Sequence, residues 1–136
     1  MSDQMGIQLL VSAGVALLGL GFLAYSAWAR HGGSPVARQW MGTEFGPRTR
    51  DERMTVLGAP MLGVMCLCFA ASALPLVGPY LMIAALPVGA LCLLLFLASL
   101  LWFVPLPDII YPRWARPLRA RNRAAEAQIR SALRRR

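Results

Sequence analysis

From Met54 to Pro107 the chain runs for 54 residues without a formal charge. This stretch consists mostly of Leu, Ala, Val, Met and Gly, and a transmembrane helix needs only about 20 consecutive apolar residues. The stretch is therefore long enough to cross a bilayer twice, and the charge-free residues 4–29 supply a third crossing. The sequence predicts an all-α integral membrane protein with three transmembrane helices and a basic cytoplasmic C-terminal helix.

Turn and loop signals divide the chain. Leu76–Pro79 (Leu-Val-Gly-Pro) predicts a tight outer turn at 78–79, and Pro79 suits the first turn of the helix that follows. Four prolines in 105–117 exclude a regular helix there, whereas alanine and arginine from Leu118 onward favour one. We expect an outside N-terminus at 1–5, spans at 6–29, 54–77 and 80–104, a cytoplasmic connection at 30–53, and an interfacial exit and Arg-rich tail at 105–136.

Individual residues predict helix starts, ends and bends. Thr49–Glu52 fits a capping box and predicts a helix start. Pro60 and Pro87 each remove a backbone hydrogen bond, so Pro60 should bend or restart the second span. Trp102 and Phe103 are expected to mark the far boundary of the third span.

The N-terminal apolar segment must be distinguished from a cleavable signal peptide. Ala27–Ala29 (Ala-Trp-Ala) matches a small-x-small cleavage pattern. The leader Met1–Gln4 has no basic residue, and the apolar run to Ala29 exceeds the usual signal core of about 7–15 residues. These features favour an uncleaved helix.

Arginine predicts the orientation. The 14 basic residues are all Arg; segment 30–53 carries five against three acidic residues, and 108–136 carries nine against two. Basic short loops remain cytoplasmic, and three spans place both segments on the same side. We therefore expect a multi-pass plasma-membrane protein with its N-terminus outside and its C-terminus in the cytoplasm. The absence of lysine favours GC-rich coding and a bacterial source.

Small residues recur along one face of each predicted span. Such stripes allow close packing of helices in lipid, and they can serve either the chain's own bundle or a partner subunit. The first span offers Ser12, Ala16, Gly19 and Ser26, the second Ala59, Gly63, Cys66, Ala70 and Ala73, and the third Ala85, Gly89, Cys92 and Ser99, interrupted by Phe96.

Sulfur groups form the one candidate for metal chemistry. Met61, Met65 and Cys68 lie at i, i+4 and i+7, on one helical face, and thioether and thiol groups are soft ligands that suit Cu(I). In outline the chain resembles the eukaryotic copper-uptake channels, with three spans, an outside N-terminus and a methionine pair in the second span. There the pair lies near the outer mouth, whereas Met61 and Met65 lie near the predicted cytoplasmic end. Copper handling is therefore a remote alternative, and no cofactor is predicted.

The remaining residues give no catalytic constellation. The predicted spans contain no ionisable Asp, Glu, Lys or Arg, which argues against proton relays and ion-coupled transport. His31, the single histidine, is interpreted as a solvated interfacial residue beside Arg30. The three cysteines lie within spans and give no disulfide framework. We expect no enzymatic activity.

The C-terminal segment is predicted to bind lipid or a protein partner. Ile109, Ile110, Tyr111 and Trp114 suit the headgroup layer, and juxtamembrane arginine is attracted to anionic lipid. No aromatic residue follows Trp114 to stack on bases, which disfavours nucleic acid as a partner. The candidate binding residues are Arg113, Arg116, Arg119, Arg121, Arg123, Arg130, Arg134, Arg135 and Arg136.

Two functional hypotheses follow. The first is a small, non-enzymatic accessory or scaffolding subunit whose small-residue faces pack against other membrane subunits or a second copy. The alternative is an oligomeric pore former that resembles the phage holins in its three spans, N-outside orientation and basic tail.

Overall fold

The computed structural model describes residues 2–42, 49–101 and 104–135, and all regular elements in this part of the chain are helical. Three helical stretches are long and apolar enough to cross a membrane, namely Ser2–His31, Asp51–Ser72 and Gly78–Leu100. The expectation of an all-helical chain with three helices of this kind is confirmed. In chain order the elements are α1 (Ser2–His31), η1 (Val36–Met41), α2 (Thr49–Arg53), η2 (Met54–Gly58), α3 (Ala59–Ser72), α4 (Gly78–Leu100), η3 (Asp108–Ile110) and α5 (Arg116–Arg134).

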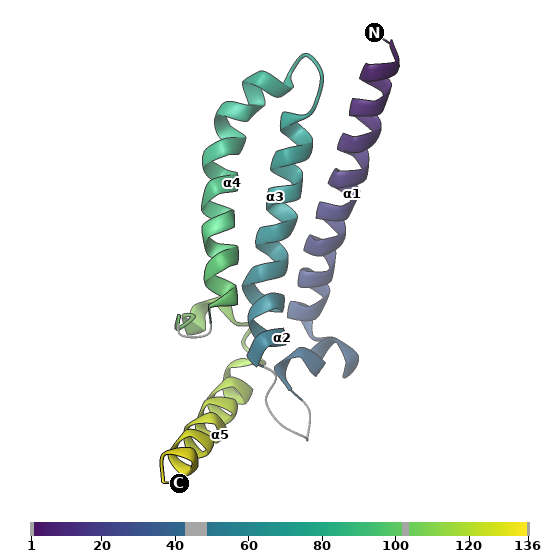
Figure 1. Ribbon diagram of the computed structural model, residues 1–136. Coiled ribbons are helices and arrows are strands. Elements are labelled where there is room, and N and C mark those ends of the chain that lie inside the picture. Colours follow the sequence, from purple (N-terminus) through teal and green to yellow (C-terminus); the bar gives the residue numbers. More distant parts are fainter. Residues whose placement is uncertain (1, 43–48, 102–103, 136) are drawn as a thin grey trace.

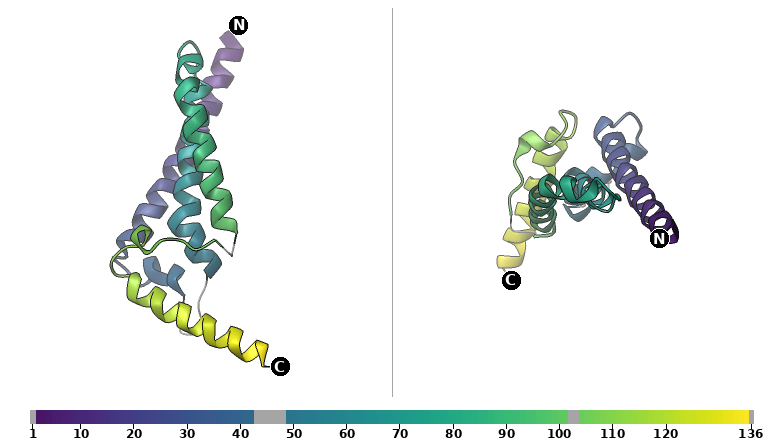
Figure 2. Two further views of the ribbon diagram at one scale, coloured as in Figure 1. Left: turned by 90° about the vertical axis from the view of Figure 1, so that its left-hand side faces the viewer. Right: turned by 90° about the horizontal axis from the view of Figure 1, so that it is seen from above.

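The three long helices form an open layer. Helix α3 lies between α1 and α4 and contacts both (Figure 1). Seen from above, α1 and α4 lie on different sides of α3 and do not close a triangle with it (Figure 2). Both outer helices therefore keep large apolar side chains at the surface, as Leu10 (75% exposed) and Ile83 (77% exposed) illustrate. Exposed apolar surface on this scale is typical of a membrane or protein contact.

The helix boundaries differ from the predicted spans of 54–77 and 80–104. Helix α3 ends at Ser72 and α4 runs from Gly78 to Leu100. The connecting turn is therefore 73–77 rather than 78–79, and Pro79 lies in the first turn of α4. Segment 73–77 is as apolar as the helices, but Pro75 disfavours helix at the residue before it and Leu76 has a φ of 69°. Trp102 and Phe103 lie outside the described residues.

Local sequence signals also account for the end of the first helix and for the start of the helical segment that leads into the second span. Helix α1 exceeds the predicted 6–29 and ends before Gly32, whose φ of 61° is left-handed. Helix α2 begins at Thr49, where the capping box predicts a helix start. The Thr49 side chain lies outside the described residues, and the Glu52 carboxylate lies 3.8 Å from Arg119 Nε.

The small residues of α1 and α3 bring their backbones into contact. A Cβ atom on Gly19 would lie 2.8 Å from the Gly63 carbonyl oxygen and 2.9 Å from Cys66 Cβ. A Cβ on Gly63 would likewise lie 2.9 Å from the Gly19 carbonyl. Ser12 adds a hydrogen bond from its hydroxyl to the Ala70 carbonyl, at 3.1 Å. Gly63, Cys66 and Ala70 from the predicted second stripe thus face α1.

The stripe of α4 packs on a different face of the second span. Cys92 and Ser99 are buried, whereas Ala85 and Gly89 are half-buried among exposed neighbours. A Cβ on Gly89 would lie 3.9 Å from Cys68 Cβ, and one on Gly58 would lie 3.1 Å from Ser99 Oγ. Both stripes therefore serve contacts within this chain, but they do not face each other.

Pro60 explains the irregular start of α3. The helix continues through this residue by widening into the π-helical turn η2 just before it. Pro60 has no N–H, so it cannot donate to the carbonyl of Val56, four residues back, or of Thr55, five residues back. Helix α1 supplies a side-chain donor to each of these two carbonyls. Ser26 Oγ donates to the Thr55 carbonyl at 3.3 Å, and Arg30 donates to the Val56 carbonyl at 2.7 Å.

Gly19→Ala should destabilise the protein by about 1–3 kcal/mol, because the added methyl group overpacks a contact between two backbones. Gly21→Ala, two residues along the same helix, is the control, since a Cβ at Gly21 meets nothing within 4 Å. Thermal unfolding in detergent would measure both variants. Equal melting temperatures would contradict the close contact between α1 and α3.

Arg30→Met should lower the stability of the wild-type chain by more than it lowers the stability of a Pro60→Ala variant. In Pro60→Ala the new N–H can donate to the Val56 carbonyl, and this carbonyl then no longer needs the hydrogen bond from Arg30. We expect a coupling energy of about 1–2 kcal/mol in this double-mutant cycle, measured from unfolding in detergent. Equal losses in the two backgrounds would show that Arg30 does not compensate for Pro60.

Candidate functional site

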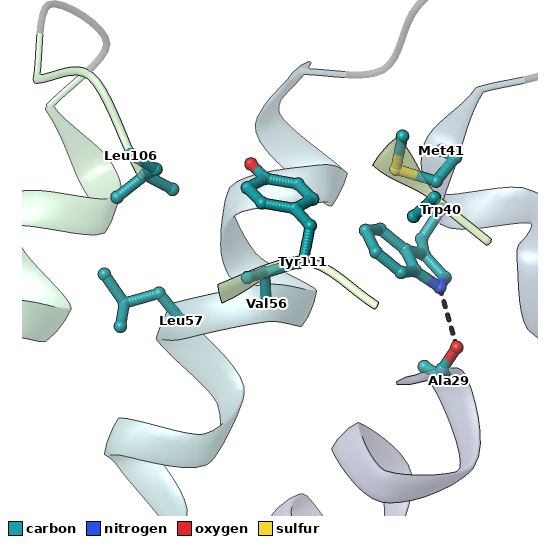
Figure 3. Packing of buried hydrophobic residues seen from close by; sticks show 8 residues of the cluster. Ala29, Trp40, Met41, Val56, Leu57, Leu106 and Tyr111 are labelled. Atoms are coloured by element: carbon teal, nitrogen blue, oxygen red, sulfur yellow. Dashed lines mark hydrogen bonds between the residues drawn. The ribbon is translucent and has the colours of Figure 1, made fainter. Parts of the chain in front are cut away.

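Loop segments and helix ends gather at one end of the layer, which we term the connector end (the described residues of 29–58 and 101–123). Its centre is a buried apolar cluster in which the Tyr111 ring lies between Leu106 and Trp40 (Figure 3). The Trp40 ring centroid is 6.5 Å from that of Tyr111 and 5.4 Å from that of Trp114, the latter edge-to-face. Aromatic pairs of this geometry add to the stabilisation from burial. The buried members are Ala29, Trp40, Met41, Val56, Leu57, Leu106, Tyr111 and Ala115.

The two tryptophans also satisfy the C-terminal end of α1. The last carbonyl groups of a helix have no partner within it. Trp40 Nε1 donates to the Ala29 carbonyl at 3.1 Å (Figure 3), and Trp114 Nε1 donates to the Arg30 carbonyl at 2.8 Å. A Cβ on Gly32 would lie 2.6 Å from the Trp114 indole, so glycine allows this close approach.

Arginines satisfy further carbonyls, one just beyond the end of α1 and two beyond the end of α4. Arg38 Nε donates to the Gly32 carbonyl at 2.6 Å, and its guanidinium lies 5.4 Å from the centroid of the Trp114 ring. Arg53 donates to two carbonyls beyond the end of α4, those of Leu101 and Val104, at 2.6 and 2.5 Å. Positive charge at a helix C-terminus is favourable, and one guanidinium can serve two acceptors at once.

Arg119 is the most buried basic group of the connector end. The residue is 6% exposed, as is Glu52. Its Nε lies 3.8 Å from a Glu52 oxygen, and its NH1 lies 2.6 Å from an Asp108 oxygen. Its NH2 donates to the Leu106 carbonyl, and the guanidinium stacks 3.9 Å from the Tyr111 ring centroid. A buried charge needs such partners, and removing one of them is costly.

Burial raises the pKa of the Tyr111 hydroxyl well above its ordinary value, and a hydrogen bond with Glu52 and the charge of that carboxylate raise it further. The hydroxyl is therefore held in its neutral form. Tyr111, Glu52 and Arg119 thus form one connected polar group inside the connector end.

The tail arginines divide into two sets. The first half of α5 is held to the connector end. Arg123 contacts Asp108 at 3.4 Å, Arg116 Nε donates to the Tyr111 carbonyl at 3.3 Å, and Asn122 donates to the Met41 carbonyl at 2.7 Å.

The second half of α5 extends away from the helices (Figure 2). Of the described candidate residues only Arg119 is buried, and the exposed ones are Arg113, Arg116, Arg121, Arg123, Arg130, Arg134 and Arg135. Arg136 lies outside the described residues.

The sulfur-bearing face of α3 takes part in packing. Met61 is half-buried and packs against the apolar cluster, and Cys68 faces Gly89 of α4. Among the described residues no three His, Cys, Asp or Glu side chains are grouped to hold a metal ion. His31 is exposed.

Two clefts lined by described residues open at the connector end. The larger, the arginine cleft, has a volume of about 810 Å³ and is lined by Arg53, Arg119, Arg123 and Arg130 with Glu52 and Glu126. The smaller, the aromatic groove, has a volume of about 490 Å³ and lies between α1, η1, α2, η2 and the start of α3. Its lining includes Phe22, Tyr25, Trp28, Trp40 and Asp51.

The fold and the connector end define a helical protein with three helices of membrane-spanning length and apolarity. The comparisons add no family to this description, because no protein-family model, no curated protein and no solved structure matches the chain.

Sequence reasoning missed the roles of Trp40, Tyr111, Trp114 and Asn122. Tyr111, expected to suit the headgroup layer, is 2% exposed and packs inside the protein, and Trp114 is half-buried against the apolar cluster. Ile109, 81% exposed, remains available at the surface. One usable signal was Asn122, an uncharged amide within an Arg- and Ala-rich helix.

Alkaline pH should loosen the connector end through Tyr111. Its pKa is higher in the folded state, so its contribution is complete below the unfolded value of about 10 and is lost as pH rises above it. The chain contains no lysine, which leaves few other groups that titrate there. In Tyr111→Phe we expect the free energy of unfolding to depend less steeply on pH above about 10. Tryptophan fluorescence would monitor the unfolding. An alkaline loss equal to that of wild type would contradict this.

Proposed function

We propose that this chain is a non-enzymatic, multi-pass plasma-membrane protein that acts as an accessory or scaffolding subunit. The carrying observation is the open layer: α1 and α4 each leave an apolar face uncovered along their length, while α3 lies between them. Exposing such apolar faces to lipid costs no free energy, so the association of helices within a membrane depends on close packing between them. Partner helices, or those of a second copy, would bind there.

The charge distribution supports a cytoplasmic connector end. The described residues at this end include Arg30, Arg38, Arg53 and the arginines in the first part of α5 (116–123), whereas 54–107 carries no charge. The positive-inside rule then places the N-terminus outside. Acidic groups of the connector end are engaged with arginine, since Glu52 and Asp108 both contact Arg119. This pairing supports a structural rather than a catalytic role for these carboxylates.

Extraction from native membranes in a mild detergent would test the accessory-subunit proposal. We expect a second membrane protein, or a second copy, to co-purify in fixed proportion. Leu10→Ala with Leu17→Ala shortens exposed side chains on α1, and Ile83→Ala with Leu94→Ala does the same on α4. We expect the two pairs of substitutions to lower the amount of co-purified partner unequally, because a partner covers one face and lipid covers the other.

Two results would contradict the proposal. Recovery of the protein alone, as a monomer, would show that no partner subunit is bound. Leakage of dye from cells that express the chain would instead favour the pore-forming alternative, whereas the accessory subunit leaves membranes intact.

A further inference from the structure

We propose that the arginine cleft binds a phosphate group, and specifically that of an anionic phospholipid. This inference rests on the membrane location in the proposed function, but it requires no partner subunit.

The position of the cleft suits a lipid headgroup. One wall is Pro105 and Leu106, which follow the end of α4 at Leu100. The other wall is α5, which crosses the end of the helical layer (Figure 2). The cleft thus lies where the chain leaves its longest apolar segment, which is the depth at which phosphates occur beside a membrane span.

The lining combines positive charge with apolar surface. Four arginines face two glutamates in the cleft, and Asp108, which contacts Arg119 and Arg123, is a third acidic group nearby. One positive charge therefore remains in excess. Leu106, Pro105 and Ala127 supply apolar contacts beside the guanidinium groups, as a phospholipid needs next to its phosphate. The volume of about 810 Å³ falls within the range of small-molecule sites.

The four arginines have different roles. Arg119 is buried between Glu52 and Asp108 and positions the wall of the cleft. Arg53 uses two nitrogens on main-chain carbonyls and so helps to hold the wall of the cleft in place.

The binding contacts come from Arg123 and Arg130, which are seven residues apart on the cleft face of α5 and are exposed. Their forked guanidinium groups match phosphate oxygens. The Arg123 pair with Asp108 is more than half exposed on both sides, and such pairs are weak enough for a phosphate to replace.

The test measures lipid retained by the full-length protein. Wild type and variants are equilibrated in phosphatidylcholine nanodiscs that contain a minor fraction of phosphatidylglycerol, extracted in mild detergent, and analysed for bound lipid by mass spectrometry. Arg123→Gln with Arg130→Gln should lower phosphatidylglycerol retention about thirtyfold, since each of the two arginines near an anionic lipid contributes about 1 kcal/mol. The control, Arg121→Gln with Arg134→Gln, removes the same charge from α5 outside the cleft and should retain nearly the wild-type amount.

Equal losses in the two pairs would overturn the proposal, because they would reflect only general attraction of the tail to lipid. Displacement of lipid by inorganic phosphate, but not by chloride at equal ionic strength, would overturn the lipid assignment and indicate a site for free anions. Arg123→Lys with Arg130→Lys keeps the charge and checks folding, and it should give intermediate retention. If only the Arg123 and Arg130 pair of substitutions lowers phosphatidylglycerol retention and no subunit co-purifies, the lipid site is supported and the accessory-subunit function is rejected.

Discussion

Main-chain carbonyl groups that helices cannot satisfy determine how the connector end is built. Helix α1 ends there, Pro60 removes a donor from the π-helical turn there, and α4 ends at the same level. An unpaired buried carbonyl is costly, so each set recruits side-chain donors from another element. Trp40 and Trp114 serve α1, Ser26 and Arg30 serve the π-helical turn, and Arg53 serves α4.

These contacts give several arginines a structural role, in addition to the membrane orientation that we propose for them. Charge alone would suffice to keep a loop in the cytoplasm, and lysine would provide it. Arg53 instead reaches two carbonyls with one planar group, and Arg119 contacts two carboxylates and one carbonyl while it stacks on a ring. The compact ammonium of lysine could not reproduce this geometry. At these positions arginine is required by the fold, whatever the coding bias of the source.

The sequence was sufficient for properties that depend on local composition and failed for those that depend on distant pairing. Three long apolar helices follow from charge-free segments, and small-residue faces follow from helical periodicity. Hydropathy did not locate the turn at 73–77, because Pro75 and Leu76 are as apolar as the helix before them. The connector end escaped prediction because its bonds join residues far apart in the chain. Trp114 and Arg30 are separated by 84 positions, and Asn122 and Met41 by 81.

The open layer makes the connector end important for the whole molecule. Helices α1 and α4 both pack on α3 (Figure 1), so their mutual placement depends on α3 and on the apolar cluster that joins Ala29 to Leu106. Arg119 links this cluster to α5 through the Leu106 carbonyl and the Tyr111 ring. A ligand that draws Arg123 away from Asp108 would leave Arg119 as the sole described arginine partner of that carboxylate. Occupancy of the arginine cleft would then remove one of the contacts between α5 and the exit from α4, and the ion pair between Arg119 and Asp108 would have to maintain that link.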